Sequence, residues 1–166
     1  VPGQKRPFAI NASGRSGSGA DLNTIDADGL SAMPFHQDPR SVPVPGCVDG
    51  WLALHEKFGR LSLEEVLADA VSLASDGFPI SSECAIATET LTDIDYVDDY
   101  LRKGIPAAGQ IVKRPGLGKV LDNLASGNRE TFYLGTFGQE LLEFGRGEYS
   151  VEDLTQPQAD WVAPIS

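Results

Sequence analysis

The residue with the clearest chemical potential is an arginine in a loop of small residues. Arg15 lies in the stretch SGRSGSG, residues 13–19, which is too rich in glycine and serine for regular secondary structure. Such an arginine is either solvated or presents a positive group beside backbone amides, an arrangement that holds carboxylates and phosphates. The spacing is not that of a phosphate-binding P-loop, because GRSGSGAD lacks the G-K-[ST] ending.

The other residues with metal-binding or catalytic side chains lack the partners that such chemistry needs. Asp26 and Asp28 alternate like part of a calcium loop, but a later glutamate and a third ligand are absent, so the pattern predicts a solvated turn. His55 falls on an apolar helix face, which is typical of a hydrogen-bonded residue in the core or at its edge. Four further carboxylates, with no histidine or cysteine nearby, predict a solvated acidic turn: Asp93, Asp95, Asp98 and Asp99. The sequence therefore predicts no metal site, no cofactor and no catalytic residue in this chain.

Length and charge narrow the class of protein. The chain has 166 residues, which fits one domain, and 41% of them are hydrophobic. The formal net charge of −11 argues against nucleic acid or an anionic membrane as the natural partner. No apolar stretch is long enough to span a membrane. Cys47 and Cys84 lie on separate predicted helices; we interpret them as two buried small hydrophobic residues, with a disulfide as the alternative.

Both ends of the sequence are typical of a fragment. The chain opens VPGQKRPF, without an initiator methionine or the apolar core of a signal peptide. It ends at WVAPIS, in the middle of a predicted strand. We therefore expect an internal segment of a longer protein, whose compartment stays open because the N-terminal sequence that would decide it is missing.

Two consecutive helices form the structural centre of the predicted fold. Apolar residues recur at helical spacing over residues 47–58 and again over residues 63–76. Ser62 and Glu65 form a capping box that marks the start of the second helix. Because a short turn joins the two helices, we expect them to pack as an antiparallel pair.

Shorter elements complete the prediction and place the arginine loop directly after a strand. In chain order they are a strand over residues 8–10, weak helix over 21–30, helices over 81–91, 115–125 and 129–144, and a strand over 161–165. The sequence therefore predicts a mostly α fold, an α+β fragment with short strands near both ends. We expect a single partial domain over residues 1–166.

The same elements carry motifs that resemble the γ-glutamyltransferase family. In that family a VPG segment leads into a helix, an aromatic-Gly turn follows, and a second helix ends in A-x-x-L-A-x-x-G-F-x-(V/I). The corresponding residues here are Val44-Pro45-Gly46, Phe58-Gly59 and the stretch from Ala70 to Ile80. Farther along, Phe132-Tyr133-Leu134-Gly135 matches F-Y-x-G, and Glu152-Asp153-Leu154 matches E-D-L. The motifs keep the family's order, and the resemblance covers essentially the whole chain.

What the resemblance implies is a self-processing amide hydrolase. Members are N-terminal nucleophile hydrolases with an αββα sandwich, and their precursor cuts itself into a large and a small subunit. The new N-terminal threonine attacks γ-glutamyl amides such as glutathione, and water or an amino acid then takes the glutamyl group from the acyl-enzyme. By this resemblance, the chain is an internal helical segment of the large subunit, inactive alone, with the small subunit as partner and the threonine outside it.

The resemblance also gives Arg15 a role. The family's large subunit has an arginine in a strand-to-loop segment before the VPG helix, which pairs with the substrate's α-carboxylate, and Arg15 stands in the matching place. The residues that follow, Ser16-Gly17-Ser18-Gly19, replace the acidic residue and proline of the glutathione-processing members and resemble a broader branch. One alternative is therefore a related hydrolase or acylase for glutaryl, cephalosporin or small-amide substrates, and another is a non-enzymatic helical interaction module.

Overall fold

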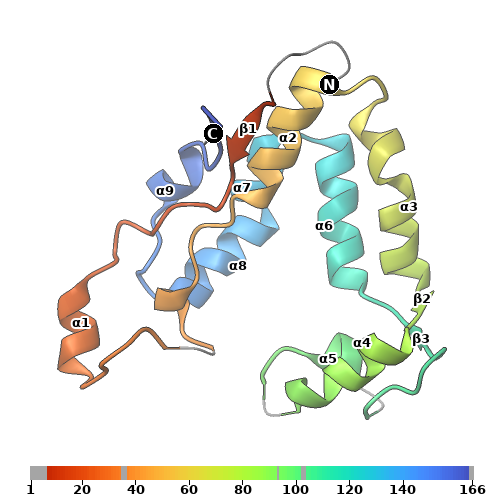
Figure 1. The fold of residues 1–166 in the computed structure, drawn as a ribbon, viewed down its shortest axis with the longest axis horizontal. Helices are drawn as coiled ribbons and strands as arrows, with labels where there is room; N and C mark the ends of the chain where they lie inside the picture. The colour runs from red at the N-terminus through yellow and green to blue at the C-terminus, as the bar shows by residue number, and fades with distance from the viewer. Residues whose placement is uncertain (1–6, 35–36, 93, 102–103, 165–166) are drawn as a thin grey trace. The chain divides into compact units, whose positions relative to one another are not determined.

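The computed structural model describes residues 7–34, 37–92, 94–101 and 104–164. The chain forms two compact units, one of residues 1–60 with 129–166 and one of residues 61–128. In Figure 1 the first unit runs from red to orange and again in blue, and the second from yellow to cyan. Two such units are compatible with parts of one larger domain, so the single partial domain over residues 1–166 stays a prediction.

The first unit joins the two ends of the chain through a small sheet. Its elements are β1 (Ala9–Asn11), α1 (Leu22–Ala27), a 3-10 turn (Pro39–Ser41), α2 (Cys47–Phe58), α7 (Arg129–Tyr133), α8 (Thr136–Gly145), α9 (Val151–Thr155) and β4 (Asp160–Val162). Strands β1 and β4 pair antiparallel, with Ile10 opposite Trp161. The predicted strands near both ends are therefore confirmed, and they lie side by side. The ammonium group of Lys57 lies 3.9 Å from the centre of the Trp161 ring and covers this sheet.

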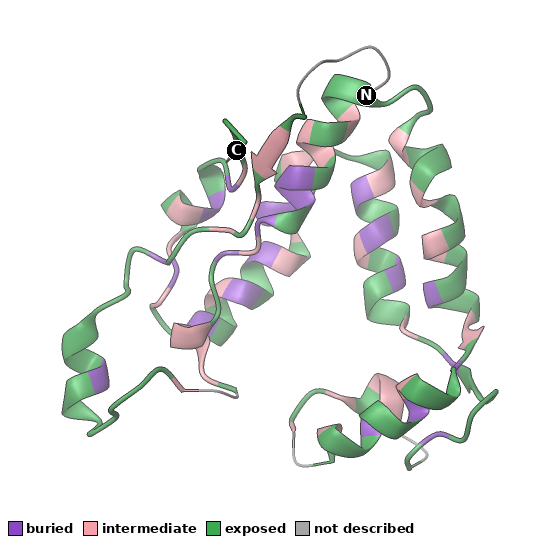
Figure 2. Ribbon diagram, viewed as in Figure 1, coloured by how far each residue is buried: buried purple, intermediate pink, exposed green. Residues whose placement is uncertain are grey.

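The core of the first unit forms where α7 contacts α2, α8 and α9. Figure 2 shows buried residues along α2, α7 and α8. The largest fully buried side chain is Tyr133, whose hydroxyl donates to the Pro45 carbonyl at 2.6 Å. Pro45 precedes the N-cap residue of α2, Gly46, so this hydrogen bond joins the entry of one helix to the end of another.

A largely buried ion pair joins the same helices. The Arg129 Nε donates to Asp49 Oδ1 at 2.9 Å, and the two side chains are only 25% and 8% exposed. The Arg129 guanidinium also donates to the carbonyls of Leu154 and Gln156 and stacks 4.3 Å from the centre of the Tyr133 ring. A single arginine therefore connects α2, α7 and the segment that follows α9.

Tyr149 fixes the proline-rich segment that leads into α2. Its side chain is buried, and its hydroxyl donates to the carbonyls of Val42 at 2.6 Å and Pro39 at 3.0 Å. Burial, together with the charge of Glu148, raises the pKa of this phenol to about 12. The folded chain therefore favours the neutral, protonated phenol of Tyr149.

The second unit is built on one helix pair. Its elements are α3 (Leu63–Asp76), β2 (Phe78–Pro79), α4 (Ser82–Ala87), a 3-10 turn (Thr88–Leu91), α5 (Asp98–Leu101), β3 (Ile111–Val112) and α6 (Pro115–Ser126). The capping box of Ser62 and Glu65 is present at the start of α3. Helix α3 packs along α6, where Gly118 lets the backbone approach Ser75 closely. A small cluster of Ile80, Ala85 and Val112 forms the core beyond these helices.

The predicted fold class is confirmed, but one predicted helix is wrong. Residues 129–144 do not form one helix, because the chain is extended at Gly135 (ψ −157°), which caps the start of α8 instead. The structure pairs α3 with α6, while α2 belongs to the other unit, so the expected pairing of residues 47–58 with 63–76 stays a prediction. Helix propensity and a short turn do not decide tertiary partners.

The environments of the cysteines differ from the prediction. Cys47 is exposed at the start of α2 and Cys84 is half-buried in α4, and both are free thiols. The expected burial is therefore wrong for Cys47, which lies on the outer side of its helix. None of the helices in the described ranges is long and apolar enough to cross a membrane.

Removing one partner of the buried ion pair should destabilise the complete protein strongly. We expect Asp49→Ala to lower the free energy of unfolding by about 3 kcal/mol, because it leaves the Arg129 charge largely buried and unpaired. Urea unfolding followed by tryptophan fluorescence measures this change. The matched control is Asp69→Ala on the exposed side of α3, which should stay within about 0.5 kcal/mol; equal effects of the two variants would contradict a special role for the pair.

Tyr149 should contribute a pH-dependent part of the stability. Its folded pKa of about 12 lies above its ordinary value of 10.0, so the stabilisation is complete below pH 10.0 and disappears as the pH rises toward 12. Tyr149→Phe should cost about 1 kcal/mol at pH 8 for the lost hydrogen bonds. Unfolding curves at pH 8, 10 and 11.5 should show this difference shrinking, whereas exposed Tyr96→Phe should show none at any pH. A constant difference for Tyr149→Phe would refute the assignment.

Candidate functional site

The loop that carries Arg15 is held rigidly by close backbone contacts. The Val44 N–H donates to the Arg15 carbonyl at 2.8 Å, which pairs the loop with the segment before α2. Gly14 has a φ of +87°, and a Cβ there would overlap with the Val44 carbonyl oxygen. A Cβ at Gly17 would overlap in the same way with the carbonyl oxygen of Glu148. The two glycines therefore allow the loop backbone to lie directly against the backbone of Val44 and Glu148, and the loop is an ordered part of the first unit.

A carboxylate at the start of α9 fixes the second half of the loop. Asp153 Oδ2 accepts from the Ser18 N–H at 2.9 Å and from the Ser18 hydroxyl at 2.8 Å. The same oxygen accepts from the Ser150 N–H at 2.8 Å, which closes a capping box. Partial burial alone would raise the pKa of Asp153, but the hydrogen bonds from Ser18 and Ser150 outweigh it and lower this pKa. Asp153 therefore stays ionised at neutral pH and binds the loop as an anion.

The guanidinium of Arg15 is directed by two acceptors on the segment after α9. Its Nε donates to the Pro157 carbonyl at 2.9 Å, and its Nη2 donates to Asp160 Oδ2 at 2.6 Å. Half of the Arg15 side chain remains exposed, as does 54% of Asp160. An oriented, half-exposed guanidinium can bind a carboxylate or phosphate through charge-assisted hydrogen bonds.

The other candidates from the sequence are not brought to this loop by the described contacts. Asp28 pairs with Arg40 at 2.7 Å, so it belongs to an ion pair of the α1 segment. His55 is half-buried on α2. In the acidic stretch, Asp99 lies 4.0 Å from Arg114, and Asp93 lies outside the described residues. Within the ranges that the structure describes, no group of three histidine, cysteine or acidic side chains is placed to hold a metal ion.

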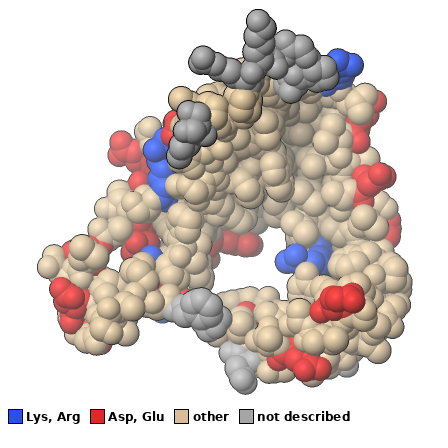
Figure 3. All heavy atoms as spheres, viewed as in Figure 1, with Lys and Arg blue, Asp and Glu red and all other residues tan. Residues whose placement is uncertain are grey.

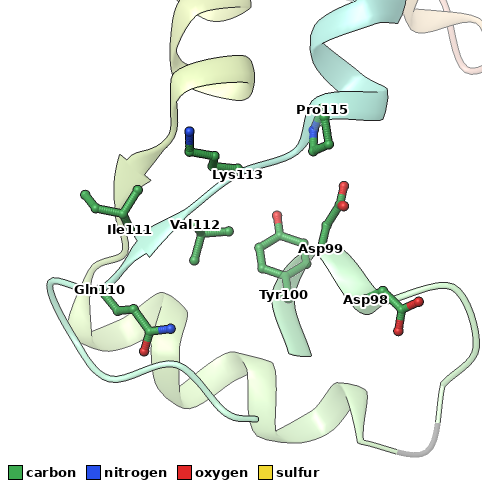
Figure 4. A pocket seen from close by; sticks show the side chains of 8 residues that line it. All are labelled: Asp98, Asp99, Tyr100, Gln110, Ile111, Val112, Lys113 and Pro115. Atoms are coloured by element: carbon green, nitrogen blue, oxygen red, sulfur yellow. The ribbon is translucent and has the colours of Figure 1, made fainter. Parts of the chain in front are cut away.

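One cavity belongs to the second unit and does not contain Arg15. It has a volume of about 410 Å³ and is lined by α5, β3 and the start of α6. Figure 4 shows the side chains of Tyr100 and Val112 approaching each other in it. Its charged lining combines Asp98 and Asp99 with Lys113, a mixture that selects no single class of ligand. We therefore place the candidate site at the Arg15 loop, where an oriented and half-exposed positive group suits an anionic ligand.

Charge on the surface agrees with the acidic composition. On the face drawn in Figure 3, red carboxylates are scattered among uncharged atoms, and the blue basic groups are fewer. With a net charge of −11, this distribution does not favour binding to a polyanion.

Sequence reasoning selected Arg15 as a candidate but did not identify the residues that orient it. Asp153 carried a signal, because it ends a capping box with Ser150, although nothing in that pattern pointed to Ser18. Asp160 and Pro157 carried no signal, since they reach Arg15 only after the two ends of the chain have paired. Long-range pairing of this kind is not readable from local periodicity.

Comparison with known sequences gives consistent matches over nearly the whole chain. The family model described as Gamma-glutamyltranspeptidase matches residues 3–166. A glutathione hydrolase-like YwrD proenzyme of Bacillus subtilis is 33% identical over 165 residues, covering 94% of this chain and 31% of the relative. An oxamate amidohydrolase proenzyme of Klebsiella pneumoniae is 32% identical over 155 residues, covering 86% of this chain and 29% of the relative.

Solved structures agree on the fold. A cephalosporin acylase from Bacillus halodurans superimposes with a TM-score of 0.86 at 27% identity, over 96% of this chain and 33% of that protein. A gamma-glutamyltranspeptidase from Helicobacter pylori superimposes with a TM-score of 0.84 over 96% of this chain and 49% of that one, and its 22% identity supports the fold alone. The chain spans about a third of the length of the curated relatives that it matches. Sequence and fold together show that the chain belongs to the gamma-glutamyltranspeptidase family.

Proposed function

We propose that this chain is part of the large subunit of an enzyme that cleaves γ-glutamyl amides such as glutathione. In this proposal Arg15 binds the α-carboxylate of the γ-glutamyl group. The observation that supports this proposal is the geometry of Arg15. Its Nε donates to the Pro157 carbonyl at 2.9 Å, its Nη2 donates to Asp160 Oδ2 at 2.6 Å, and half of the side chain stays exposed. A held guanidinium loses little conformational freedom when a carboxylate binds, which favours affinity.

The reaction itself requires a group that we place outside this chain. The N-terminal threonine of the small subunit attacks the amide carbonyl through its hydroxyl oxygen, and its own α-amine takes the hydroxyl proton. The amine of the substrate leaves with a proton, and an acyl-enzyme ester remains. Water then hydrolyses this ester, or the amine of an acceptor amino acid displaces the threonine. Arg15 holds the far end of the acyl group throughout.

Helix α2 supports the presence of a further part of the same precursor. While Val48 and Asp49 are buried in the first unit, Trp51 and Leu54 are large apolar residues of α2 that are exposed, and the partly exposed Phe58 packs on Phe8 and Trp161. A helix with apolar residues on both sides is usually covered on both sides. We infer that the small subunit, or the rest of the large one, packs on this exposed apolar surface of α2. An interaction module could also use such a surface to bind a partner, so it is the family membership that favours the enzyme over a non-enzymatic helical interaction module.

A related amide hydrolase is the second candidate, and the comparisons favour it specifically. One relative is an oxamate amidohydrolase, and one of the solved structures is a cephalosporin acylase. The serine- and glycine-rich residues after Arg15 agree with this broader branch. Assays of the complete protein with γ-glutamyl, glutaryl and oxalyl amides separate the two candidates by the substrate with the highest kcat/KM.

Arg15 should matter for any substrate whose acyl group carries the recognised carboxylate. In the complete protein we expect Arg15→Ala to lower kcat/KM for γ-glutamyl 4-nitroanilide about 100-fold, through loss of a charged hydrogen-bonded contact. Arg15→Lys should recover only part of this loss, because an ammonium group lacks the planar fork. The matched control is Arg60→Ala at an exposed position, with unchanged kinetics. Wild-type kinetics for Arg15→Ala would remove Arg15 from the site.

Self-cleavage of the precursor should depend on one threonine beyond this chain. Expression of the complete reading frame should yield two polypeptides on a denaturing gel, and N-terminal sequencing of the smaller one should begin with threonine. Replacing that threonine by alanine should leave one uncut, inactive chain, because both the nucleophile and the new N-terminus are lost. Thr90→Ala, at an exposed position here, is the control and should be cut normally. A complete frame that is never cut would contradict the proposal.

A further inference from the structure

The two hydrogen bonds of Arg15 use one particular edge of its guanidinium. A guanidinium can bind a carboxylate bidentately through its side edge, formed by Nε and Nη2, or through its terminal edge, formed by Nη1 and Nη2. Here Nε donates to the Pro157 carbonyl and Nη2 donates to Asp160. Both nitrogens of the side edge are therefore engaged by the protein, and Nη1 of the terminal edge has no hydrogen-bond partner among the described residues.

We propose that Asp160 is a positioning residue, which together with the Pro157 carbonyl presents the terminal edge of Arg15 to the carboxylate of the acyl substrate. The inference rests on the proposed role of Arg15 and adds to it how the arginine is aimed. It assigns Asp160 a part in selecting acyl groups with a terminal carboxylate, without contact between Asp160 and the reacting amide.

The segment that carries both acceptors is fixed from the buried core. The Gln158 N–H donates to Asp49 Oδ2 at 2.6 Å, and Arg129 donates to the carbonyls of Leu154 and Gln156. Pro157 therefore lies between two residues whose backbones are bound to the same ion pair. On its other side, Asp160 starts β4 and is paired in register with Asn11 of β1. Both acceptors of Arg15 are thus held independently of the arginine.

Exposure argues that the pair with Asp160 serves orientation more than stability. Both side chains are about half exposed (50% and 54%), and ion pairs of this kind add little to the stability of a fold because water screens them. An oriented arginine, by contrast, binds a planar carboxylate with less loss of side-chain freedom.

The test compares Asp160→Ala and Asp160→Asn in the complete protein with three anilides. γ-Glutamyl and glutaryl 4-nitroanilide carry the carboxylate. Butanoyl 4-nitroanilide has the same acyl chain as the glutaryl compound but lacks the terminal carboxylate. We expect Asp160→Ala to raise KM about five-fold for the first two, with kcat within about two-fold, and to leave butanoyl anilide unchanged. Asp160→Asn keeps an oxygen acceptor for Nη2, so its KM should lie near that of the wild type. Where butanoyl anilide is cleaved too slowly, its inhibition constant gives the same comparison.

The outcomes separate this inference from the proposed function. Equal losses for all three anilides in Asp160→Ala would mean a general structural role and would overturn the inference. Unchanged KM in Asp160→Ala, together with a large effect of Arg15→Ala, would also overturn it while leaving the proposed function intact. Unchanged kinetics in Arg15→Ala would remove the basis of both. The matched control Asp69→Ala, on the exposed side of α3, should behave as wild type with every anilide.

Discussion

The ion pair between Asp49 and Arg129 is the interaction on which the first unit depends. It joins residues 80 positions apart, and its carboxylate is almost fully buried. A buried charge is tolerated only when its hydrogen bonds are satisfied, and here each partner also binds backbone groups of residues 154–158. The Tyr133 ring under Arg129 completes the arrangement. The pair therefore does more than join two helices, because it determines the path of the segment that returns to β4.

That path explains how a glycine-rich loop takes a defined position in the first unit. Residues 13–19 have few side chains of their own to pack, so their position comes from neighbours: Val44 and Glu148 through backbone contacts, and Asp153 through Ser18. The Arg15 side chain is then aimed by the segment after α9. Since that segment is bound to the ion pair, the orientation of the exposed arginine depends on charges buried inside the unit.

Local signals in the sequence predicted elements well and partners poorly. The capping box at Ser62 and the limits of residues 47–58 followed from hydrogen bonding and periodicity within a few residues. The pairing of α3 with α6 and the break at Gly135 depend on tertiary packing, which local periodicity does not contain. Asp49 illustrates the limit. An acidic residue in the first turn of a helix is usually solvated and interacts favourably with the helix dipole. Only the fold reveals that Asp49 is buried.

Arg15 shows why an exposed ion pair can be worth keeping at a site. Fold stability gains little from it, because water screens both charges. Recognition gains more, because an arginine that is already straightened and oriented offers a carboxylate two parallel hydrogen bonds without first being ordered. In the proposed site, the orientation of one arginine would select the carboxylate, and contacts elsewhere would select among acyl groups.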